Sequence, residues 1–326
     1  MWDGGCFLLQ RGDERVLNEP VDILKVHPVR KTKVQKEVFR SDVQTYVKEL
    51  GYSSYVEEGT FGVRNLIIGD PQTAQYLVTA HYDTPASIGL PNILTPCNLL
   101  TYILWQFVMI GGLLTVALAG VFVTDLLTRN MVATLLVGYA LYFGILFLMI
   151  FGPANKSNVN DNSSGVITLL EIARSMPAMH RNKVCFVLFD LEEAGLKGSA
   201  SYRKSHKTET EKQVVLNLDC VGDGDHILFF PTKKAKKNKV LMQRIYRLGG
   251  WFGRKHIQLK DKGFCIYPSD QRNFPVGIGI AAFHKGKLVG YYCNKIHTKK
   301  DTILEETNVN LLRAALTTLI CGDAVN

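Results

Sequence analysis

Histidine and carboxylate side chains stand in five short segments of the sequence, most at the end of an apolar stretch and one at the start of an expected helix. These segments hold His81 with Asp83, Asp161, Glu192 with Glu193, Asp219, and His297. Imidazole nitrogens and carboxylate oxygens are ligands of Zn²⁺ and similar divalent ions, and one glutamate of an adjacent pair is left free to carry a proton. Because ligands bind beyond the carboxyl ends of the strands in open α/β sheets, we expect these groups to meet at one site.

Each of the five segments alone also has a simple structural explanation. An aspartate after a strand commonly caps the following helix, and a single histidine is commonly a packed or surface residue. Five such segments in one chain favour metal chemistry over five separate coincidences. No cysteine stands at any of these positions, so the ligand set is one of imidazoles and carboxylates.

The segments that carry these residues have the periodicity of alternating strands and helices. A helix is expected at 33–50, where Val34, Val38, Val43, Val47 and Leu50 recur at helical spacing. Further helices are expected at 164–176, 199–206, 239–252 and 308–320. Strands are expected at 65–68, 76–80, 184–189, 214–218, 227–230, 257–259 and 278–283. This alternation predicts an α/β fold, a three-layer sandwich around a mostly parallel mixed sheet.

Two long apolar segments interrupt the alternation. Residues 99–123 and 131–151 contain no charged side chain, and as helices they measure about 37 and about 31 Å. Each is long enough for a bilayer core of about 30 Å, and the short connection at 124–130 makes them antiparallel. The alternative is a hairpin buried in a soluble core, although soluble helices are rarely apolar on every face. We expect a transmembrane hairpin at 99–151, inserted into one catalytic domain formed by 1–98 and 152–326.

The expected side of the membrane is the cytoplasm. Both spans enter and leave on one side, so the catalytic domain and both termini share a compartment. The connection at 124–130 has one arginine, whereas the flanking domain holds nearly all of the 38 Lys and Arg residues. We interpret the seven cysteines as reduced, as in the cytosol. Residues 1–10 lack the basic start and apolar stretch of a secretory signal.

The net charge of +9 is concentrated in two basic clusters, at 25–40 and 233–239. Neither cluster belongs to a recognisable nucleic-acid-reading motif, so we expect no nucleic-acid partner. Solvated helix and loop faces, or attraction to an anionic membrane surface, account for the clusters. The charged fraction of 21% and the absence of low-complexity tracts exclude a disordered chain.

Together the five segments resemble the co-catalytic di-zinc aminopeptidase family, which is related to bacterial leucyl aminopeptidases and to glutaminyl cyclases. The similarity extends from about Lys33 to Ile320. It implies two Zn²⁺ ions per chain, with Asp161 bridging them. The implied metal ligands are His81, Asp161, Glu193, Asp219 and His297. Two cations close together would lower the pKa of a shared water and stabilise an oxyanion.

The resemblance also implies roles outside the metal ligands. Glu192 would be the general base, and Asp83 would orient the His81 ring. Tyr291 or Tyr292 would stabilise the oxyanion. Relatives often have Ser-Asp-His where this chain has Ser-Asp-Gln at 269–271, a change that concerns substrate contacts rather than the metal centre. Single-zinc cyclases use fewer ligands, so the full set favours hydrolysis over cyclisation.

The place of the hairpin bears on the substrate. It lies in the connection between His81 and Asp161, at the sheet edge that carries the site, which puts the mouth of the site near the membrane and suggests substrate delivery from or along the bilayer. We expect a membrane-integrated zinc aminopeptidase for peptides, including hydrophobic or membrane-associated ones. The alternatives are an amide hydrolase for lipidated or biosynthetic molecules and a catalytically silent scaffold, which has no need of Glu192. A homo-oligomer is left open.

Overall fold

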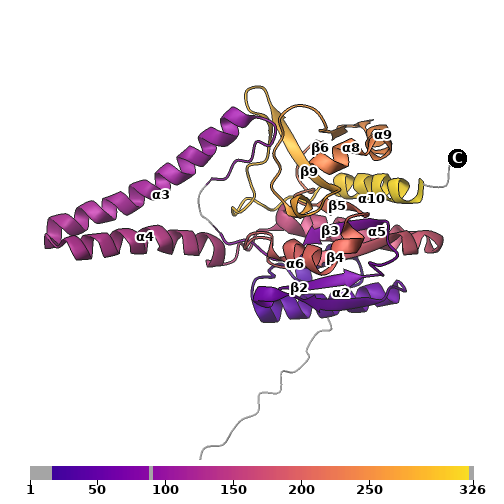
Figure 1. The fold of residues 1–326 in the computed structure, drawn as a ribbon, viewed down its shortest axis with the longest axis horizontal. Coiled ribbons are helices and arrows are strands. Elements are labelled where there is room, and N and C mark those ends of the chain that lie inside the picture. Colours follow the sequence, from indigo (N-terminus) through magenta and orange to yellow (C-terminus); the bar gives the residue numbers. More distant parts are fainter. Residues whose placement is uncertain (1–16, 88–90, 323–326) are drawn as a thin grey trace, which may run out of the picture.

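Ten strands form the central sheet of the protein, in the order β1-β2-β4-β3-β5-β9-β6-β8-β7, with β10 paired to β9 (Figure 1). The structure is a computed structural model that describes residues 17–87 and 91–322. The central strands β4, β3, β5 and β9 run parallel, and antiparallel pairs flank them. The strands are β1 (Ser54–Glu58), β2 (Arg64–Ile68), β3 (Tyr76–His81), β4 (Val184–Phe189), β5 (Val214–Leu218), β6 (His226–Pro231), β7 (Gly250–Phe252), β8 (Lys255–Leu259), β9 (Gly277–Gly286) and β10 (Gly290–Tyr292).

Helices lie on both faces of this sheet, and two long helices project away from it (Figure 1). The helices of the described chain are α1 (Ile23–Val26), α2 (Lys33–Glu49), α3 (Leu99–Thr128), α4 (Met131–Phe151), α5 (Gly165–Ser175), α6 (Lys197–Ser205), α7 (Lys207–Thr210), α8 (Lys233–Lys237), α9 (Lys239–Leu248) and α10 (Glu306–Cys321). Apolar residues of α2, α5, α9 and α10 join one face of the sheet in the main core. On the other face, Tyr202 of α6 packs with Val187 and Phe189, because alternate strand residues point to opposite sides. The predicted three-layer α/β fold is confirmed.

Most of the expected elements form within a few residues of the predicted bounds, but one helix was drawn too long. The segment 239–252 was expected to be helical throughout, whereas α9 ends at Leu248 and residues 250–252 form strand β7. Gly250 has a φ of +149°, a conformation that favours glycine over other residues and is incompatible with helix. Strands β1 and β10 were also missed, because both lie at the antiparallel margins of the sheet, where the apolar pattern is weak.

The buried side of α2 differs from the one that the sequence indicated. Val34 and Val38, taken as part of the apolar stripe, are 69% and 49% exposed. The side chains that α2 buries are Lys36, Phe39, Arg40, Val43, Tyr46 and Val47. Lys36 can be buried because its ammonium lies 2.5 Å from the carboxylate of Asp190. Two buried cations therefore hide the true periodicity of this helix from a pattern of apolar residues.

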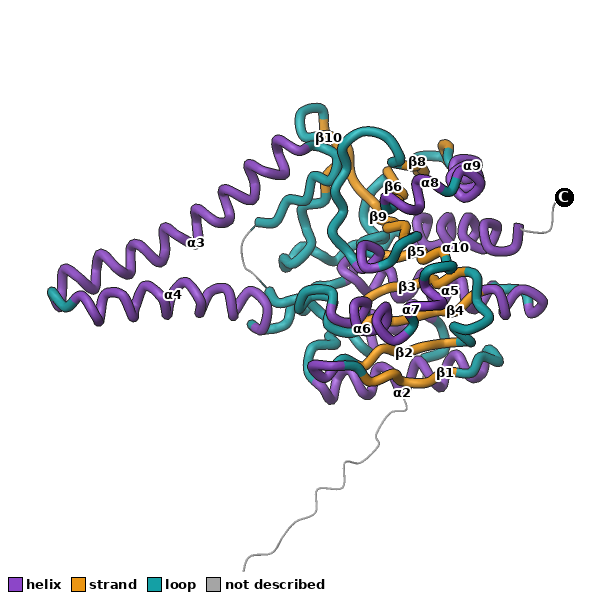
Figure 2. The backbone as a smooth tube through the Cα atoms, in the orientation of Figure 1, coloured by secondary structure: helices purple, strands orange, loops and turns teal. Residues whose placement is uncertain are grey.

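The two apolar segments form the long helices α3 and α4, which project together from one side of the domain (Figure 2). By length and composition both helices could cross a membrane, and in the most apolar stretch of each helix only 6% is buried. This exposure excludes the alternative of a hairpin buried in a soluble core. Helix α3 continues to Thr128 rather than ending near residue 123, so the connection to α4 shrinks to Arg129 and Asn130.

One prediction about the cysteines is wrong. Cys97 and Cys265 form a disulfide, although all seven cysteines were interpreted as reduced. The two residues are 168 positions apart, so no local spacing could have revealed the pair. Among the described residues, Cys185, Cys220, Cys293 and Cys321 are free. Cys6 and the rest of residues 1–10, which carried the expectation about a signal sequence, lie outside the described residues.

Candidate metal centre

The candidate ligands converge because the strands that precede them end at one edge of the sheet. His81 is the last residue of β3 and pairs with Phe189, the last residue of β4. The glutamate pair follows β4 directly, and Asp219 follows β5, which runs parallel to β3. Parallel neighbours bring their carboxyl ends to the same edge. The convergence expected from the sequence is confirmed for these residues.

Asp161 and His297 reach the same place from loops. Asp161 lies in the segment Val159–Ser164 that leads into α5, and His297 follows β10. The backbone of His297 has a φ of +60°, and Leu191 and Cys220, each next to a candidate residue, have φ values of +54° and +56°. Left-handed backbone at non-glycine residues is uncommon and is concentrated at functional sites, where the surrounding structure holds it in place.

The central carboxylate of the site belongs to Asp161. Its Oδ1 lies 3.2 Å from Nε2 of His81, and its Oδ2 lies 3.0 Å from Nε2 of His297. Nε2 of His81 is also 3.6 Å from Oδ1 of Asp219, and Nε2 of His297 is 3.6 Å from Oε2 of Glu193. One carboxylate thus presents an oxygen to each of two imidazoles, and each imidazole has a second carboxylate beside it.

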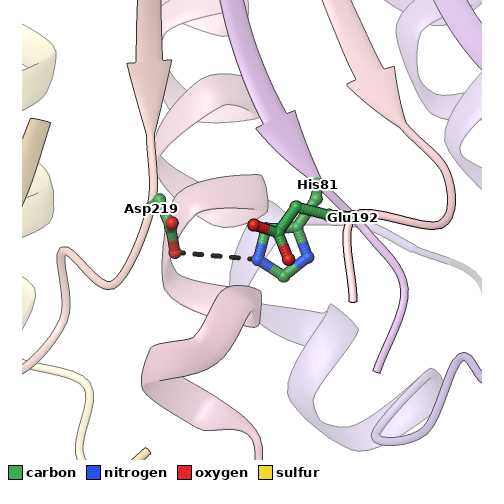
Figure 3. Close-up of side chains that lie close together, drawn as sticks. All are labelled: His81, Glu192 and Asp219. Carbon is green, nitrogen blue, oxygen red and sulfur yellow. Dashed lines mark ion pairs between the residues drawn. The ribbon is translucent and has the colours of Figure 1, made fainter. Parts of the chain in front are cut away.

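The two neighbouring glutamates are held by Asp83. The backbone N–H groups of Glu192 and Glu193 donate to Oδ1 and Oδ2 of Asp83 at 3.0 and 3.2 Å, and Nδ1 of His81 lies 3.5 Å from Oδ1 of Asp83. Asp83 therefore faces both the imidazole and the glutamate turn. Figure 3 shows the Glu192 carboxylate at the His81 ring, with Asp219 to the left and a dashed line from Asp219 to that ring.

The charges of the site depend on one another. Burial alone would lower the pKa of His297, but Glu193 and Asp161 outweigh burial and raise it to about 9. Burial, with the charge of Asp161, raises the pKa of Glu193 to about 8 against the effect of His297. Burial opposes ionisation of Asp161, yet the two imidazoles hold the pKa of that carboxyl well below its usual range.

The donor set fits zinc. Two imidazoles and several carboxylates are the nitrogen and oxygen ligands that Zn²⁺ accepts. Three overlapping groups have ligand atoms within 4.8 Å of one another: His81–Glu192–Asp219, His81–Asp161–Glu193 and Asp161–Asp219–Cys220. The first of these groups contains Glu192 rather than Glu193, so the geometry brings both glutamates within reach of His81. Their division into one base and one ligand remains a prediction, as does the number of ions.

A cavity of about 250 Å³ opens beside these residues. All five candidate ligands and Glu192 line it, together with Tyr267 and, from the first turns of α3, Tyr102 and Gln106. Tyr291 and Tyr292 are not among its lining residues in the described part of the chain. The Tyr291 hydroxyl instead donates to Oε1 of Gln258 at 2.6 Å. An oxyanion role for either tyrosine stays a prediction that this geometry does not support.

Sequence reasoning missed several residues that build the site. Asp301 accepts from the backbone N–H groups of Asn160 and Asp161 at 2.7 and 3.0 Å, and so fixes the bridging segment. Its signal was present, since it stands four residues after His297. The buried Arg30 donates to the Tyr82 carbonyl at 2.6 Å, and nothing in the sequence around it announces this role.

Gln271, where relatives often have histidine, is buried between two strands and a loop. Its Nε2 donates to the Tyr267 carbonyl at 2.8 Å, and its Oε1 accepts from Asn217 at 3.2 Å. Gln271 therefore holds the backbone of Tyr267, a residue that lines the cavity. The departure from the family pattern acts on the cavity wall and leaves the candidate ligands untouched.

Zinc uptake by the metal-free protein should release protons. Neighbouring carboxylates raise the pKa of His297, and burial raises the pKa of Glu193, so this pair keeps a proton near neutral pH, and a ligand must lose its proton to bind. Zinc affinity should therefore rise between pH 6 and pH 9. Calorimetry in buffers of different ionisation enthalpy measures the protons, and elemental analysis at saturation should find two zinc ions per chain. Affinity that is independent of pH, or a single ion at saturation, would contradict the assignment.

The sequence is similar to one family of known proteins. Residues 149–320, more than half of the chain, match the sequence profile described as peptidase family M28. No curated protein matches the sequence.

Solved structures share the fold. A glutaminyl cyclase from Porphyromonas gingivalis has a TM-score of 0.57 at 15% identity, covering 94% of this chain and 98% of its own. A Zn-dependent exopeptidase from Parabacteroides distasonis has a TM-score of 0.54 at 14% identity, covering 90% and 91%. An aminopeptidase from Legionella pneumophila has a TM-score of 0.55 at 13% identity, covering 94% and 71%.

Proposed function

Since the chain belongs to peptidase family M28, we propose that it is a membrane-integrated, zinc-dependent aminopeptidase that removes N-terminal residues from peptides at the membrane surface. The observation that carries the proposal is the position of Asp161, whose two carboxylate oxygens lie 3.2 and 3.0 Å from the imidazoles of His81 and His297. With the family assignment, this arrangement supports a hydrolytic zinc site. The aminopeptidase activity and the membrane location are the proposed part.

The residues of this chain divide the work of hydrolysis. The five candidate ligands would hold zinc, which supplies a Lewis acid that lowers the pKa of water and stabilises negative charge on oxygen. Glu192 takes a proton from the attacking water and gives it to the leaving amine. Burial raises the pKa of Glu192 well above its usual range, and the neighbouring carboxylates add to this effect. A base of raised pKa accepts a proton more readily and can then release it to the amine.

Hydrolysis is favoured here over the cyclisation that the names of some structural neighbours describe. The chain retains two imidazoles and a carboxylate between them, whereas single-zinc cyclases use a reduced ligand set. A non-peptide amide with the same scissile bond would suit the same groups, so an amide hydrolase is the second candidate function. The full donor set and the buried Glu192 count against a silent scaffold.

The proposal predicts a specific pattern of substrates. The purified, zinc-loaded protein should release the reporter group from aminoacyl substrates with a free N-terminus and leave N-acetylated analogues intact. A chelator should abolish the activity because it removes the zinc, and added zinc should restore the activity by binding the same ligands again. Equal turnover of free and N-blocked substrates would favour the amide hydrolase. Formation of a cyclised product without hydrolysis would favour a cyclase.

We propose that α3 and α4 cross the membrane, with the catalytic domain on one side. The charge of the flanking domain supports the cytoplasmic side. The Cys97–Cys265 disulfide instead supports the non-cytoplasmic side, since disulfides persist in oxidising compartments. The argument from reduced cysteines therefore no longer supports the cytoplasm. A compartment-sensitive reporter fused after α10, compared with the same reporter fused at Arg129, would show on which side of the membrane the catalytic domain lies.

A further inference from the structure

We propose that the face of α3 that leads from its contact with α4 to the cavity holds the apolar part of the substrate, so that the enzyme selects amphiphiles. The preferred substrate would have a free amine next to the scissile amide and an apolar tail that stays in the bilayer. This inference rests on the proposed function and adds a substrate class and a route of entry to it.

The two helices are attached to different parts of the domain. The chain before α3 is tied to the far side of the cavity by the Cys97–Cys265 disulfide and by the pairing of Leu94 with Cys293. The end of α4 is tied elsewhere, since Lys31 donates to the Ile150 carbonyl at 3.0 Å. Figure 1 shows the two helices together at their far tip and well apart where they meet the domain.

The point of closest approach of the helices lies away from the domain. A Cβ added at Gly120 of α3 would lie 2.1 Å from a methyl carbon of Leu141, and one at Gly138 of α4 would lie 2.6 Å from Val121. Such clashes show that the backbones cross closely at these glycines. From this crossing towards the domain the two helices diverge (Figure 1).

One face of α3 connects the crossing to the cavity. Gln106, Leu113 and Gly120 follow one another at intervals of seven residues, which is about two turns of an α-helix, so they lie on the same side of α3. Gly120 faces α4 at the crossing, and Gln106 lines the cavity with the candidate metal ligands. The inner face of α3, defined by these three residues, therefore leads from the space between the helices to the site.

The chemistry of this path suits an amphiphile. Residues 99–123 of α3 carry no charge, and Ile93, Leu94 and Ile296 add apolar surface to the cavity wall. The inner end of the path is polar, with the carboxyl groups of Glu192 and Glu193 in the same wall. An apolar tail gains free energy along the first part, while the amine meets hydrogen-bonding oxygens in the second. The tail thus brings the amine to the ligands from the membrane side.

The test compares two substrates and two variants. The substrates are an aminoacyl amide with a long alkyl tail and the same amide with a methyl group, both in lipid nanodiscs. Leu113→Trp places a bulky ring on the inner face. Leu118→Trp is the matched control, since Leu118 lies on the opposite side of α3 and is 64% exposed. The ratio of kcat/KM for tailed over untailed substrate should fall at least about tenfold in Leu113→Trp, equivalent to losing burial of about two methylene groups, and should not change in Leu118→Trp.

A second measurement uses the full-length protein without substitution and without turnover. A long-chain alkylamine with a photoreactive group in its chain should label the inner face of α3 around Leu113 and spare Leu118. Equal labelling of both positions, or an unchanged ratio in a folded, zinc-loaded Leu113→Trp, would overturn the inference. Failure of the wild-type protein to cleave even the untailed amide would instead count against the proposed aminopeptidase, and labelling still decides whether the path binds amphiphiles.

Discussion

Replacing Glu192 by glutamine should remove turnover while leaving zinc content and fold intact. The amide matches the carboxylate in shape but cannot accept the proton of the attacking water, and loss of such proton transfer typically costs about 10²–10⁴-fold in rate. The backbone N–H of Glu192 would still donate to Asp83, so the turn that follows β4 keeps its support. Steady-state kinetics on a free aminoacyl substrate, together with elemental analysis, measure the two effects separately.

The neighbouring glutamate provides the matched control. Glu193→Gln makes the same chemical change one residue along the chain, at a carboxylate whose Oε2 lies 3.6 Å from His297. We expect it to weaken zinc binding, because an amide oxygen is a poorer ligand than a carboxylate. If Glu192→Gln loses zinc and Glu193→Gln loses only turnover, the two roles are exchanged, as the His81–Glu192–Asp219 group would allow.

Replacing residues 98–151 by a Gly/Ser linker should give a water-soluble domain that still binds zinc. The replacement removes both apolar helices and leaves every candidate ligand in place. Its cost in loop closure is small, because this cost grows only slowly with loop length. Size-exclusion chromatography without detergent measures the solubility. The linker variant should cleave short aminoacyl substrates, with altered KM since Tyr102 and Gln106 leave the cavity wall, and should lose any preference for apolar tails.

Two outcomes would change this interpretation of the hairpin. A soluble, zinc-loaded linker variant that keeps the preference for tailed substrates would reduce α3 and α4 to an anchor. A full-length protein that stays monodisperse without detergent would remove the membrane from the proposal. The linker variant with Glu192→Gln serves as the control, since hydrolysis in it above the residual rate left by a loss of about 10²–10⁴-fold must come from contamination.

The sequence was most informative where chemistry and strand order coincide. His81, Glu192, Glu193 and Asp219 could be placed together because each follows a predicted strand, and parallel strands share the edge at which they end. Asp161 and His297 lie in loops, so no pattern of apolar residues located them, and their roles as ligands came from the family resemblance. Strands β3, β4 and β5 could be predicted from the sequence because both of their faces are buried, which makes each a nearly continuous apolar run.

What the sequence could not show depends on contacts between distant residues. Arg30 and Lys36 look like surface cations, yet both are buried because partners from other segments satisfy them. The oxyanion role came from the family resemblance, and Tyr291 and Tyr292 were chosen for it because they stand shortly before His297 along the chain. In three dimensions the Tyr291 ring lies under the ammonium of Lys260, 4.3 Å from the ring centroid. Nearness in sequence is a poor guide where a strand separates two loops.

The bond between Cys97 and Cys265, which are 168 positions apart, closes a large part of the chain into a covalent ring. The ring contains the apolar helices and the candidate carboxylates Asp161, Glu192, Glu193 and Asp219, while both imidazoles lie outside it. A closed loop of this length has far fewer unfolded conformations than an open one, a difference of about 5 kcal/mol in the chain-entropy account. The same bond therefore restricts the unfolded conformations of the apolar helices and those of the four candidate carboxylates. Reducing it would release both segments together.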